Sequence, residues 1–253
     1  MTTEIQRKKI WLLLIGIPLF MQLSCNRHLY LHREKSNFYE VNANVVADSS
    51  MNAFLHPYKT SVDTQMKLVI GRTDIMLTKA QPESSLGNFM ADAQLIAAQK
   101  IDKKVQLSVL NYGGIRLPYM AAGAITKEKI YELMPFDNRL TIVELSGKEV
   151  AELCQFIAAA KGWPISGFSF KIKDQTAVDI QIGDAPLQEN LMYKLALSDY
   201  LANGGDKLEV VRNAKRKATS IYIRDALITY ITDLTAKNQP LHPVIENRIS
   251  YAE

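Results

Sequence analysis

The apolar residues between Met51 and Tyr251 change their spacing several times along the chain, and this feature most constrains the fold. A spacing of three or four residues is typical of a helix with one buried face, whereas alternation is typical of a half-buried strand. Helices are predicted over 51–66, 84–100, 146–161 and 219–234. Strands are predicted over 68–70, 105–110, 140–145, 168–172, 178–182, 192–197 and 248–251. A chain that mixes the two patterns in this order is expected to build an α+β or α/β fold.

Local signals mark where several of these elements begin. The Ser84-Ser85 pair can cap the second helix, and Ser146 with Glu149 three residues later forms a capping box for the third. Pro57 indicates that the first helix is either bent or started near that residue. After Trp163-Pro164 the three strand patterns are separated by short polar turns, so we expect them to be antiparallel neighbours.

The segments with these patterns follow one another without an internal repeat, a low-complexity stretch or a linker. Nearly half of the residues, 47%, are apolar, which is enough for an ordinary hydrophobic core. A single domain is therefore predicted over 45–253, of the α+β (mixed α/β) class, with layered helices and mixed sheets.

Residues 1–25 have the layout of a signal peptide, in which a basic stretch precedes an apolar run shorter than the roughly 20 residues of a membrane-spanning helix. Ser24 directly before Cys25 resembles the lipobox of bacterial lipoproteins, in which the cysteine is acylated and becomes the mature N-terminus. Gln22 departs from the aliphatic residue that is usual there and leaves ordinary cleavage open. We expect an exported cell-envelope protein with a lipid anchor at Cys25, at the periplasmic face or outer membrane, and a tether over 26–44.

The charge of the chain gives no indication of a polyanionic partner. Lysine and arginine outnumber aspartate and glutamate by 30 to 26, and residues 1–24 carry three basic side chains against one acidic, so two of the four net charges leave with that segment. A remaining net charge near +2 predicts no nucleic-acid binding. The densest basic run, 215–217, is predicted to be a solvated loop. Cys154 lies in a helical apolar pattern and is predicted to be a buried small hydrophobe.

Four short segments join a turn to side chains that suit a planar, hydroxylated, anionic ligand. They are 83–88, 111–116, 135–138 and 199–206. Taken singly, each has an ordinary structural explanation, such as a strand turn at Gly113-Gly114, a helix stop at Gly204-Gly205 or a core ring at Phe136. Together, in this order and at these spacings, they resemble the C-terminal, substrate-binding domain of the 5′-nucleotidase family. The resemblance covers roughly residues 84–248 and implies a single domain of that type over 45–253.

The resemblance also implies a mode of nucleotide recognition. The base would be clamped between the rings of Phe136 and Tyr200, and such stacking contributes about 1–3 kcal/mol per base for any base. Asn111 matches the family residue that bonds the base edge, and Asp206 the residue that accepts bonds from the ribose hydroxyls. Arg116 matches the cation near ribose and phosphate, where its planar fork can bond two oxygens.

This chain departs from the family pattern at two positions. Pro82 stands where many members have a second, phosphate-holding arginine, which puts phosphate affinity in doubt. Tyr200 stands where phenylalanine is common; a tyrosine still stacks, but its hydroxyl needs water or a polar partner.

In the full-length family, hydrolysis belongs to a separate N-terminal domain that holds two metal ions through Asp-x-His, Gly-Asn-His-Asp/Glu and Gly-His-x-His motifs. None of these motifs occurs here, and the four histidines, His28, His32, His56 and His242, are scattered. We therefore assign no catalytic residue, metal ligand or cofactor to this chain.

The leading hypothesis is the nucleotide-recognition half of a cell-envelope 5′-nucleotidase, a phosphoric monoester hydrolase of nucleotide catabolism. A separate metallophosphatase chain would supply the divalent metals and the catalysis. The alternative is a stand-alone nucleotide- or nucleoside-binding lipoprotein, which Pro82 favours. A third hypothesis keeps the fold without the ligand, as a structural component of an envelope complex.

Overall fold

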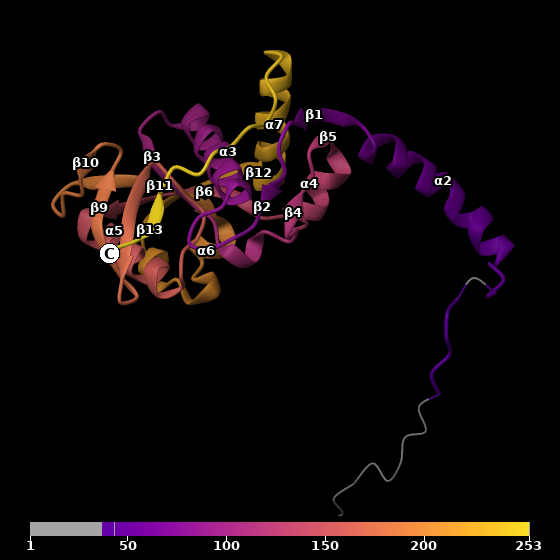
Figure 1. Cartoon of the computed structure of the whole chain (residues 1–253), viewed down its shortest axis with the longest axis horizontal. Helices are drawn as coiled ribbons and strands as arrows, with labels where there is room; N and C mark the ends of the chain where they lie inside the picture. The colour runs from indigo at the N-terminus through magenta and orange to yellow at the C-terminus, as the bar shows by residue number, and fades with distance from the viewer. Residues whose placement is uncertain (1–36, 43, 253) are drawn as a thin grey trace, which may run out of the picture. The chain divides into compact units, whose positions relative to one another are not determined.

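The molecule is described here by a computed structural model, which covers residues 37–42 and 44–252 (Figure 1). The predicted signal peptide, Cys25 and most of the predicted tether lie outside the described residues. The chain divides into two units, Met1–Asn52 and Ala53–Glu253, and all of the described strands belong to the second. None of the described helices is both long enough and apolar enough to cross a membrane.

Helix α2 runs from Ser49 to Met66 and confirms the first predicted helix. Asp48 caps it, because its carboxylate Oδ1 accepts hydrogen bonds from the backbone N–H groups of Ser50 and Met51. A start near Pro57 is therefore wrong, since this proline lies inside the helix. No residue of α2 is buried.

The largest sheet has five strands in the order β12-β6-β11-β3-β7. Their bounds are Val105–Val109 for β3, Arg139–Ser146 for β6, Ile165–Ser166 for β7, Met192–Ser198 for β11 and Lys215–Tyr222 for β12. Strand β11 is parallel to β3 and antiparallel to β6. As a result, β3 and β11 end at the same edge of the sheet at which β6 begins.

A second sheet has the order β10-β9-β8-β13. Its strands are Phe168–Lys173 (β8), Thr176–Ile182 (β9), Ala185–Pro186 (β10) and Ile249–Tyr251 (β13). Strands β8 and β9 are antiparallel neighbours as predicted, and β13 confirms the predicted terminal strand. The prediction that the strand over 192–197 is their neighbour is wrong. That strand, β11, is buried at most positions on both faces, so it belongs at the centre of the larger sheet.

Two short antiparallel pairs complete the strands. Strand β1 (Val69–Thr73) pairs with β5 (Gly123–Thr126), and β2 (Leu77–Thr78) pairs with β4 (Tyr119–Met120). Strand β1 confirms the strand predicted near 68–70 and continues to Thr73.

The remaining helices confirm most of the capping signals. They are Ser85–Ile101 (α3), Lys127–Leu133 (α4), Gly147–Ala159 (α5), Asp199–Ala202 (α6) and Ile223–Ala236 (α7), with 3-10 turns at Tyr112–Gly114, Gly205–Lys207 and Glu209–Val211. The Ser84 hydroxyl accepts a bond from the Gly87 N–H at 3.0 Å and starts α3. Both bonds of the Ser146–Glu149 capping box are present at the start of α5.

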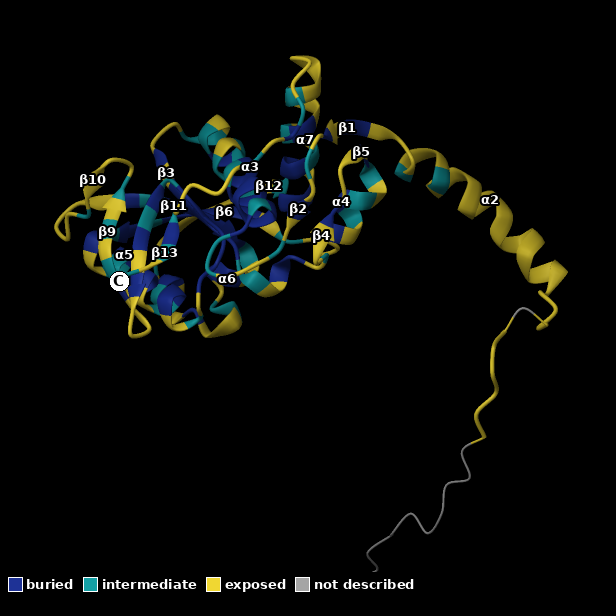
Figure 2. Cartoon of the chain, viewed as in Figure 1, coloured by how far each residue is buried: buried dark blue, intermediate teal, exposed yellow. Residues whose placement is uncertain are grey.

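The core forms where these helices pack on the sheets, and Figure 2 shows the buried residues concentrated there. Helix α5 contributes Val150, Leu153 and Ile157 to a cluster with Leu107 of β3 and Leu195 of β11. Cys154 belongs to the same cluster and is fully buried, as predicted. Burial raises the pKa of its thiol to about 12, so the thiol stays protonated at neutral pH.

The segment before α7 differs from the prediction. Residues 215–222 form strand β12 on the edge of the five-stranded sheet, so neither the solvated loop at 215–217 nor a helix start near Thr219 is correct. Most side chains of β12 are exposed and charged or small, and the strand is held by its backbone pairing with β6. The apolar alternation that would have marked it as a strand is therefore absent.

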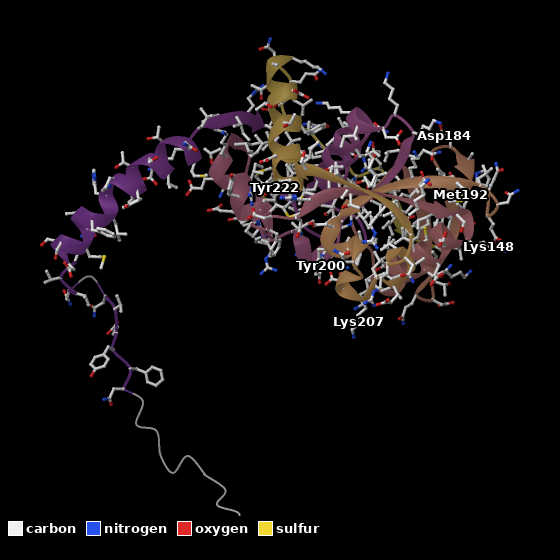
Figure 3. All side chains as sticks on the ribbon, turned by 180° about the vertical axis from the view of Figure 1, so that it is seen from behind. Lys148, Asp184, Met192, Tyr200, Lys207 and Tyr222 are labelled. Atoms are coloured by element: carbon white, nitrogen blue, oxygen red, sulfur yellow. The ribbon has the colours of Figure 1, made fainter. Side chains whose placement is uncertain are left out.

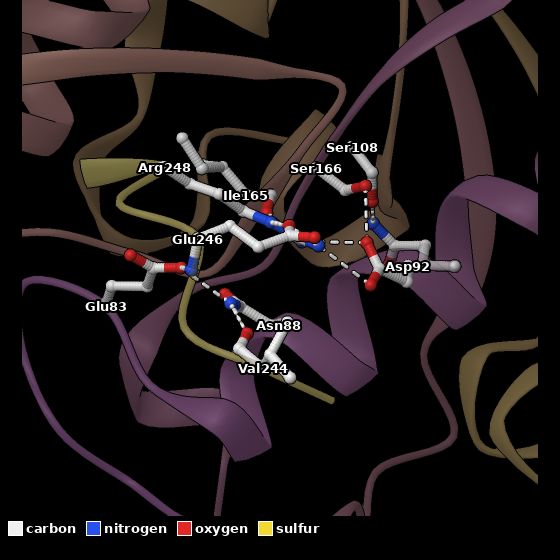
Figure 4. Close-up of polar contacts among 10 residues, drawn as sticks. Glu83, Asn88, Asp92, Ser108, Ile165, Ser166, Val244, Glu246 and Arg248 are labelled. Carbon is white, nitrogen blue, oxygen red and sulfur yellow. Dashed lines mark hydrogen bonds and ion pairs between the residues drawn. The ribbon is translucent and has the colours of Figure 1, made fainter. Parts of the chain in front are cut away.

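A network of ion pairs and hydrogen bonds connects the segment directly before the C-terminal strand to α3 (Figure 4). Arg248 donates from Nη1 and Nη2 to the carboxylate of Asp92 at 2.7 and 2.9 Å, and Ser166 of β7 donates to the same carboxylate at 2.6 Å. Glu83 accepts from Asn88 Nδ2 at 2.6 Å and from the Glu246 backbone N–H at 2.9 Å. These contacts join three parts of the chain that are distant in sequence.

Replacing Arg248 is expected to destabilise the fold. Its side chain is 13% exposed, so Arg248→Ala leaves the Asp92 carboxylate partly buried without its cation. We expect the free energy of unfolding to fall by about 3 kcal/mol, measured by urea denaturation. Arg212→Ala is the control, because the Arg212–Glu209 pair is exposed on both sides (58% and 65%) and its loss should cost less than about 1 kcal/mol. Equal losses in the two variants would contradict a structural role for the network.

Candidate functional site

A cavity of about 320 Å³ lies at the sheet edge where β3 and β11 end and β6 begins. Its lining consists of Asn111, Gly113, Gly114, Arg116, Phe136, Asn138, Tyr200 and Asp206. The structure therefore brings all five predicted site residues together. A larger groove of about 940 Å³ beside β1, β5 and the end of α7 has no aromatic side chain among its described lining residues. The smaller cavity is the better candidate for a planar ligand.

The first wall of the cavity is the turn that follows β3. This turn is closed by a hydrogen bond from the Gly114 N–H to the Asn111 carbonyl at 3.0 Å, which confirms the predicted turn. A Cβ on Gly114 would stand 2.8 Å from Asn111 Oδ1, so a side chain there would displace the Asn111 amide. Arg116 donates from Nη1 to the Gly113 carbonyl at 3.3 Å at the end of the same turn.

Lys79 supports this turn from outside the cavity lining. Its ammonium donates to the Ile115 carbonyl at 2.8 Å and lies 4.0 Å from the centroid of the Tyr112 ring. Burial, followed by the nearby charge of Arg116, lowers the pKa of Lys79. The sequence carries no signal for this role, because the contact joins segments that are 36 residues apart.

The second wall is the loop before β6, which presents Phe136. This ring is 40% exposed and lies 5.7 Å from the Arg116 guanidinium carbon. Arg224 of α7, itself only 8% exposed, holds the loop through a bond to Asp137 Oδ1 at 2.7 Å and a longer one to the Phe136 carbonyl at 3.4 Å. The Arg224 guanidinium also lies 4.1 Å from the ring of Tyr131.

Asp199 connects the second wall to the third. Its Oδ1 accepts from the backbone N–H of Arg139, where β6 begins, at 3.0 Å, and from the N–H of Tyr200 at 2.9 Å. One carboxylate oxygen therefore sets the separation between the Phe136 loop and the segment that carries Tyr200.

The third wall consists of α6, which carries Tyr200, and the turn after it, which carries Asp206; the two residues contact each other. The Tyr200 hydroxyl donates to Asp206 Oδ1 at 2.7 Å and accepts from the Asp206 backbone N–H at 3.1 Å. Asn111 Nδ2 donates to Asp206 Oδ2 at 2.6 Å, which joins the first wall to the third. The hydrogen bond to Asp206 raises the pKa of the Tyr200 phenol. Figure 3 labels Tyr200 and Lys207, the next residue after Asp206, near each other on the lower side of the domain in that view.

Gly205 allows the Tyr200 ring to take this position. A Cβ on Gly205 would lie 2.5–2.6 Å from three atoms of the ring, too close for any side chain without movement. Gly204 before it has φ 86°, a backbone conformation that glycine adopts without strain. Neither glycine lines the cavity, but Gly205 packs against the Tyr200 ring that does, so the pair is more than a helix stop.

Segment 83–88 does not line the cavity, although the sequence pattern grouped it with the other three. Glu83 and Asn88 belong to the network around Arg248. Pro82 borders a separate void of about 10 Å³ beside Trp163 and Arg248. The residues of segment 83–88 therefore stabilise the fold and do not contact the cavity.

The described residues contain no group of three or more His, Cys, Asp and Glu side chains that could hold a metal ion. His56 and His242 are both exposed and belong to different parts of the chain. The side chains in the described part of the molecule do not fit a two-metal centre, and we derive no hydrolytic step from them.

Comparison with known proteins identifies the family of this domain. Residues 67–213 match the family model described as 5′-nucleotidase, C-terminal domain, over more than half of the chain. The chain belongs to this family. The matched residues include all five predicted site residues, and the predicted fold of this family's type is confirmed.

The chain matches only part of the length of each individual relative. It is 26% identical over 172 residues to a 5′-nucleotidase of Vibrio parahaemolyticus, covering 64% of this chain and 30% of the relative. It is 29% identical over 217 residues to the endonuclease YhcR of Bacillus subtilis, covering 81% of this chain and 17% of that protein. A solved 5′-nucleotidase precursor from Thermus thermophilus has a TM-score of 0.68 at 26% identity, over 80% of this chain and 43% of that chain. The family domain is thus a fraction of each of these proteins.

The wall geometry predicts that Gly205→Ala damages the site of this family domain. The added Cβ meets the Tyr200 ring, which must move away from Asp206. We expect adenosine affinity to fall at least about tenfold by calorimetry, a loss of roughly 1.4 kcal/mol. In the control Gly183→Ala, the new Cβ meets no atom within 4 Å, and only a stability cost from its φ of 57° is expected. Unchanged affinity in Gly205→Ala would contradict the assignment of this wall.

Proposed function

We propose that this family domain binds a nucleotide or nucleoside in the cavity between Phe136 and Tyr200. The observation that carries the proposal is the convergence of three walls on one cavity of about 320 Å³, from segments spread between residues 111 and 206. Two half-exposed aromatic rings in one cavity suit a flat base, because every base has a π face. The polar groups around them suit the rest of a nucleotide.

Three of the polar residues that line the cavity then have roles that fit their positions. Asn111 bonds the base edge, Asp206 accepts from the ribose hydroxyls, and Arg116 lies beside Phe136 to bond ribose or phosphate oxygens. These roles follow the family resemblance, and the shared lining of the cavity supports them.

We further propose that catalysis, and with it the divalent metals, comes from a separate metallophosphatase chain. Two findings support this division: the match is to a C-terminal domain, and the described side chains do not fit a two-metal centre. The signal-peptide layout of residues 1–25 supports a place in the cell envelope, with Cys25 as the proposed lipid anchor. The complete function would be hydrolysis of nucleotide monophosphates in nucleotide catabolism.

A stand-alone nucleoside receptor is the second candidate. The composition of the cavity lining favours this receptor. Arg116 is the one cationic side chain among the described residues that line the cavity. Pro82 borders a different void and brings no charge to the cavity. A single cation would hold a phosphate less firmly than a pair, so the receptor predicts similar affinities for adenosine and adenosine monophosphate.

The division of labour predicts that the purified chain alone does not hydrolyse adenosine monophosphate. Phosphate release is measured with manganese, zinc or cobalt, and again after adding an exported metallophosphatase encoded beside its gene. Activity that appears only on mixing supports the split enzyme. Activity of the lone chain that is lost in Arg116→Ala would overturn it, and no activity in either assay would favour the receptor.

The stacking role predicts that Phe136→Ala weakens nucleoside binding. Loss of about 1–3 kcal/mol of stacking corresponds to a roughly 5- to 150-fold lower affinity for adenosine in calorimetry. Tyr119→Ala is a matched control, because Tyr119 is an exposed aromatic residue (54%) on β4 outside the cavity lining. Similar affinities of Phe136→Ala and the control would contradict a base clamp at this ring.

A further inference from the structure

Asp206 has a backbone conformation that needs support from its surroundings. Its φ of 52° and ψ of 24° lie in the left-handed region, and Lys207 after it has φ 65°. A residue with a side chain is disfavoured there, and such positions persist when neighbouring contacts hold them. The contacts that hold Asp206 therefore determine where its carboxylate points.

Three hydrogen bonds hold this residue, and two of them involve the Tyr200 hydroxyl. The hydroxyl donates to Oδ1 at 2.7 Å and accepts from the Asp206 N–H at 3.1 Å, so one oxygen atom bonds both the backbone and the side chain of Asp206. Asn111 Nδ2 holds the other carboxylate oxygen, Oδ2, at 2.6 Å. The carboxylate is thereby fixed in rotation, with one bond on each oxygen.

A fixed carboxylate of this kind retains capacity for a ligand. Each oxygen of an ionised carboxylate has two lone-pair positions, and one bond on each leaves one position free on each oxygen. Two free acceptor positions on adjacent oxygens match two neighbouring hydroxyl donors, such as the 2′ and 3′ hydroxyls of ribose. A sugar without these hydroxyls cannot use them.

We propose that the Tyr200 hydroxyl is a positioning group that orients the Asp206 carboxylate and thereby makes the site prefer ribose over a sugar without vicinal hydroxyls. The inference rests on the proposed nucleoside function and deepens it. A phenylalanine at position 200 would keep a ring for stacking but would remove both bonds to Asp206. The hydroxyl lowers the entropic cost of binding by holding the carboxylate in place beforehand.

The test compares Tyr200→Phe with the wild-type chain in binding adenosine and 2′,3′-dideoxyadenosine by calorimetry. We expect Tyr200→Phe to bind adenosine about five- to tenfold more weakly and to bind the dideoxy nucleoside with unchanged affinity, because the stacking ring remains. The ratio of the two affinities should therefore fall by the same factor. Tyr119→Phe, on an exposed tyrosine outside the cavity lining, is the matched control and should leave both affinities unchanged.

A second measurement needs no ligand. The Asp206 amide N–H donates to the Tyr200 hydroxyl, so its hydrogen exchange should become at least about threefold faster in Tyr200→Phe. The pKa of the Tyr200 phenol is raised by its bond to Asp206. In Asp206→Asn this pKa should return toward its ordinary value, as measured by ultraviolet titration.

The outcomes separate this inference from the proposed function. Equal losses for both nucleosides, or an unchanged ratio, would show that the hydroxyl only packs the ring and would overturn the inference while nucleoside binding stands. Unchanged amide exchange would overturn the positioning role in the same way. If the wild-type chain binds neither nucleoside, the proposed function itself is wrong, and the sugar preference is refuted with it.

Discussion

The pairing of β11 between β3 and β6 is the constraint on which the site depends. Parallel pairing places the ends of β3 and β11 at one sheet edge, and antiparallel pairing places the start of β6 at the same edge. The three segments that leave or enter the sheet there carry Asn111, Phe136 and Tyr200. A cavity at this edge therefore follows from strand order, and the loops only shape it.

Much of this fold could be predicted from local sequence signals, because the interactions that these signals describe join residues only a few positions apart. The caps at Ser84 and Ser146 and the turn after β3 depend on neighbours three or four positions away. The placement of β11 and the existence of β12 depend on pairing with β6, which lies about 50 and 75 residues earlier in the chain. Apolar spacing describes which face a strand buries but does not name its neighbour.

In the site, too, the sequence predicts some residues and gives no signal for others. Residues that face the cavity could be predicted only because several short segments together resemble the family pattern, since each segment taken singly has an ordinary structural explanation. Lys79, Asp199 and Arg224 could not be assigned their supporting roles, because their contacts are with backbone or side-chain atoms of distant segments. The grouping of 83–88 with the ligand segments was wrong for the related reason that a family pattern also contains residues that hold the fold together.

The two edges of the five-stranded sheet are closed to further strands by different means. Strand β7 has only two residues, too few to offer a continuous row of free N–H and C=O groups. Strand β12 is longer, but Lys215, Arg216 and Lys217 are exposed along it. Positive charges in a row repel the same edge of a second molecule and resist the sheet-to-sheet association that leads to aggregation. The basic run thus protects an exposed strand edge, a role separate from ligand recognition.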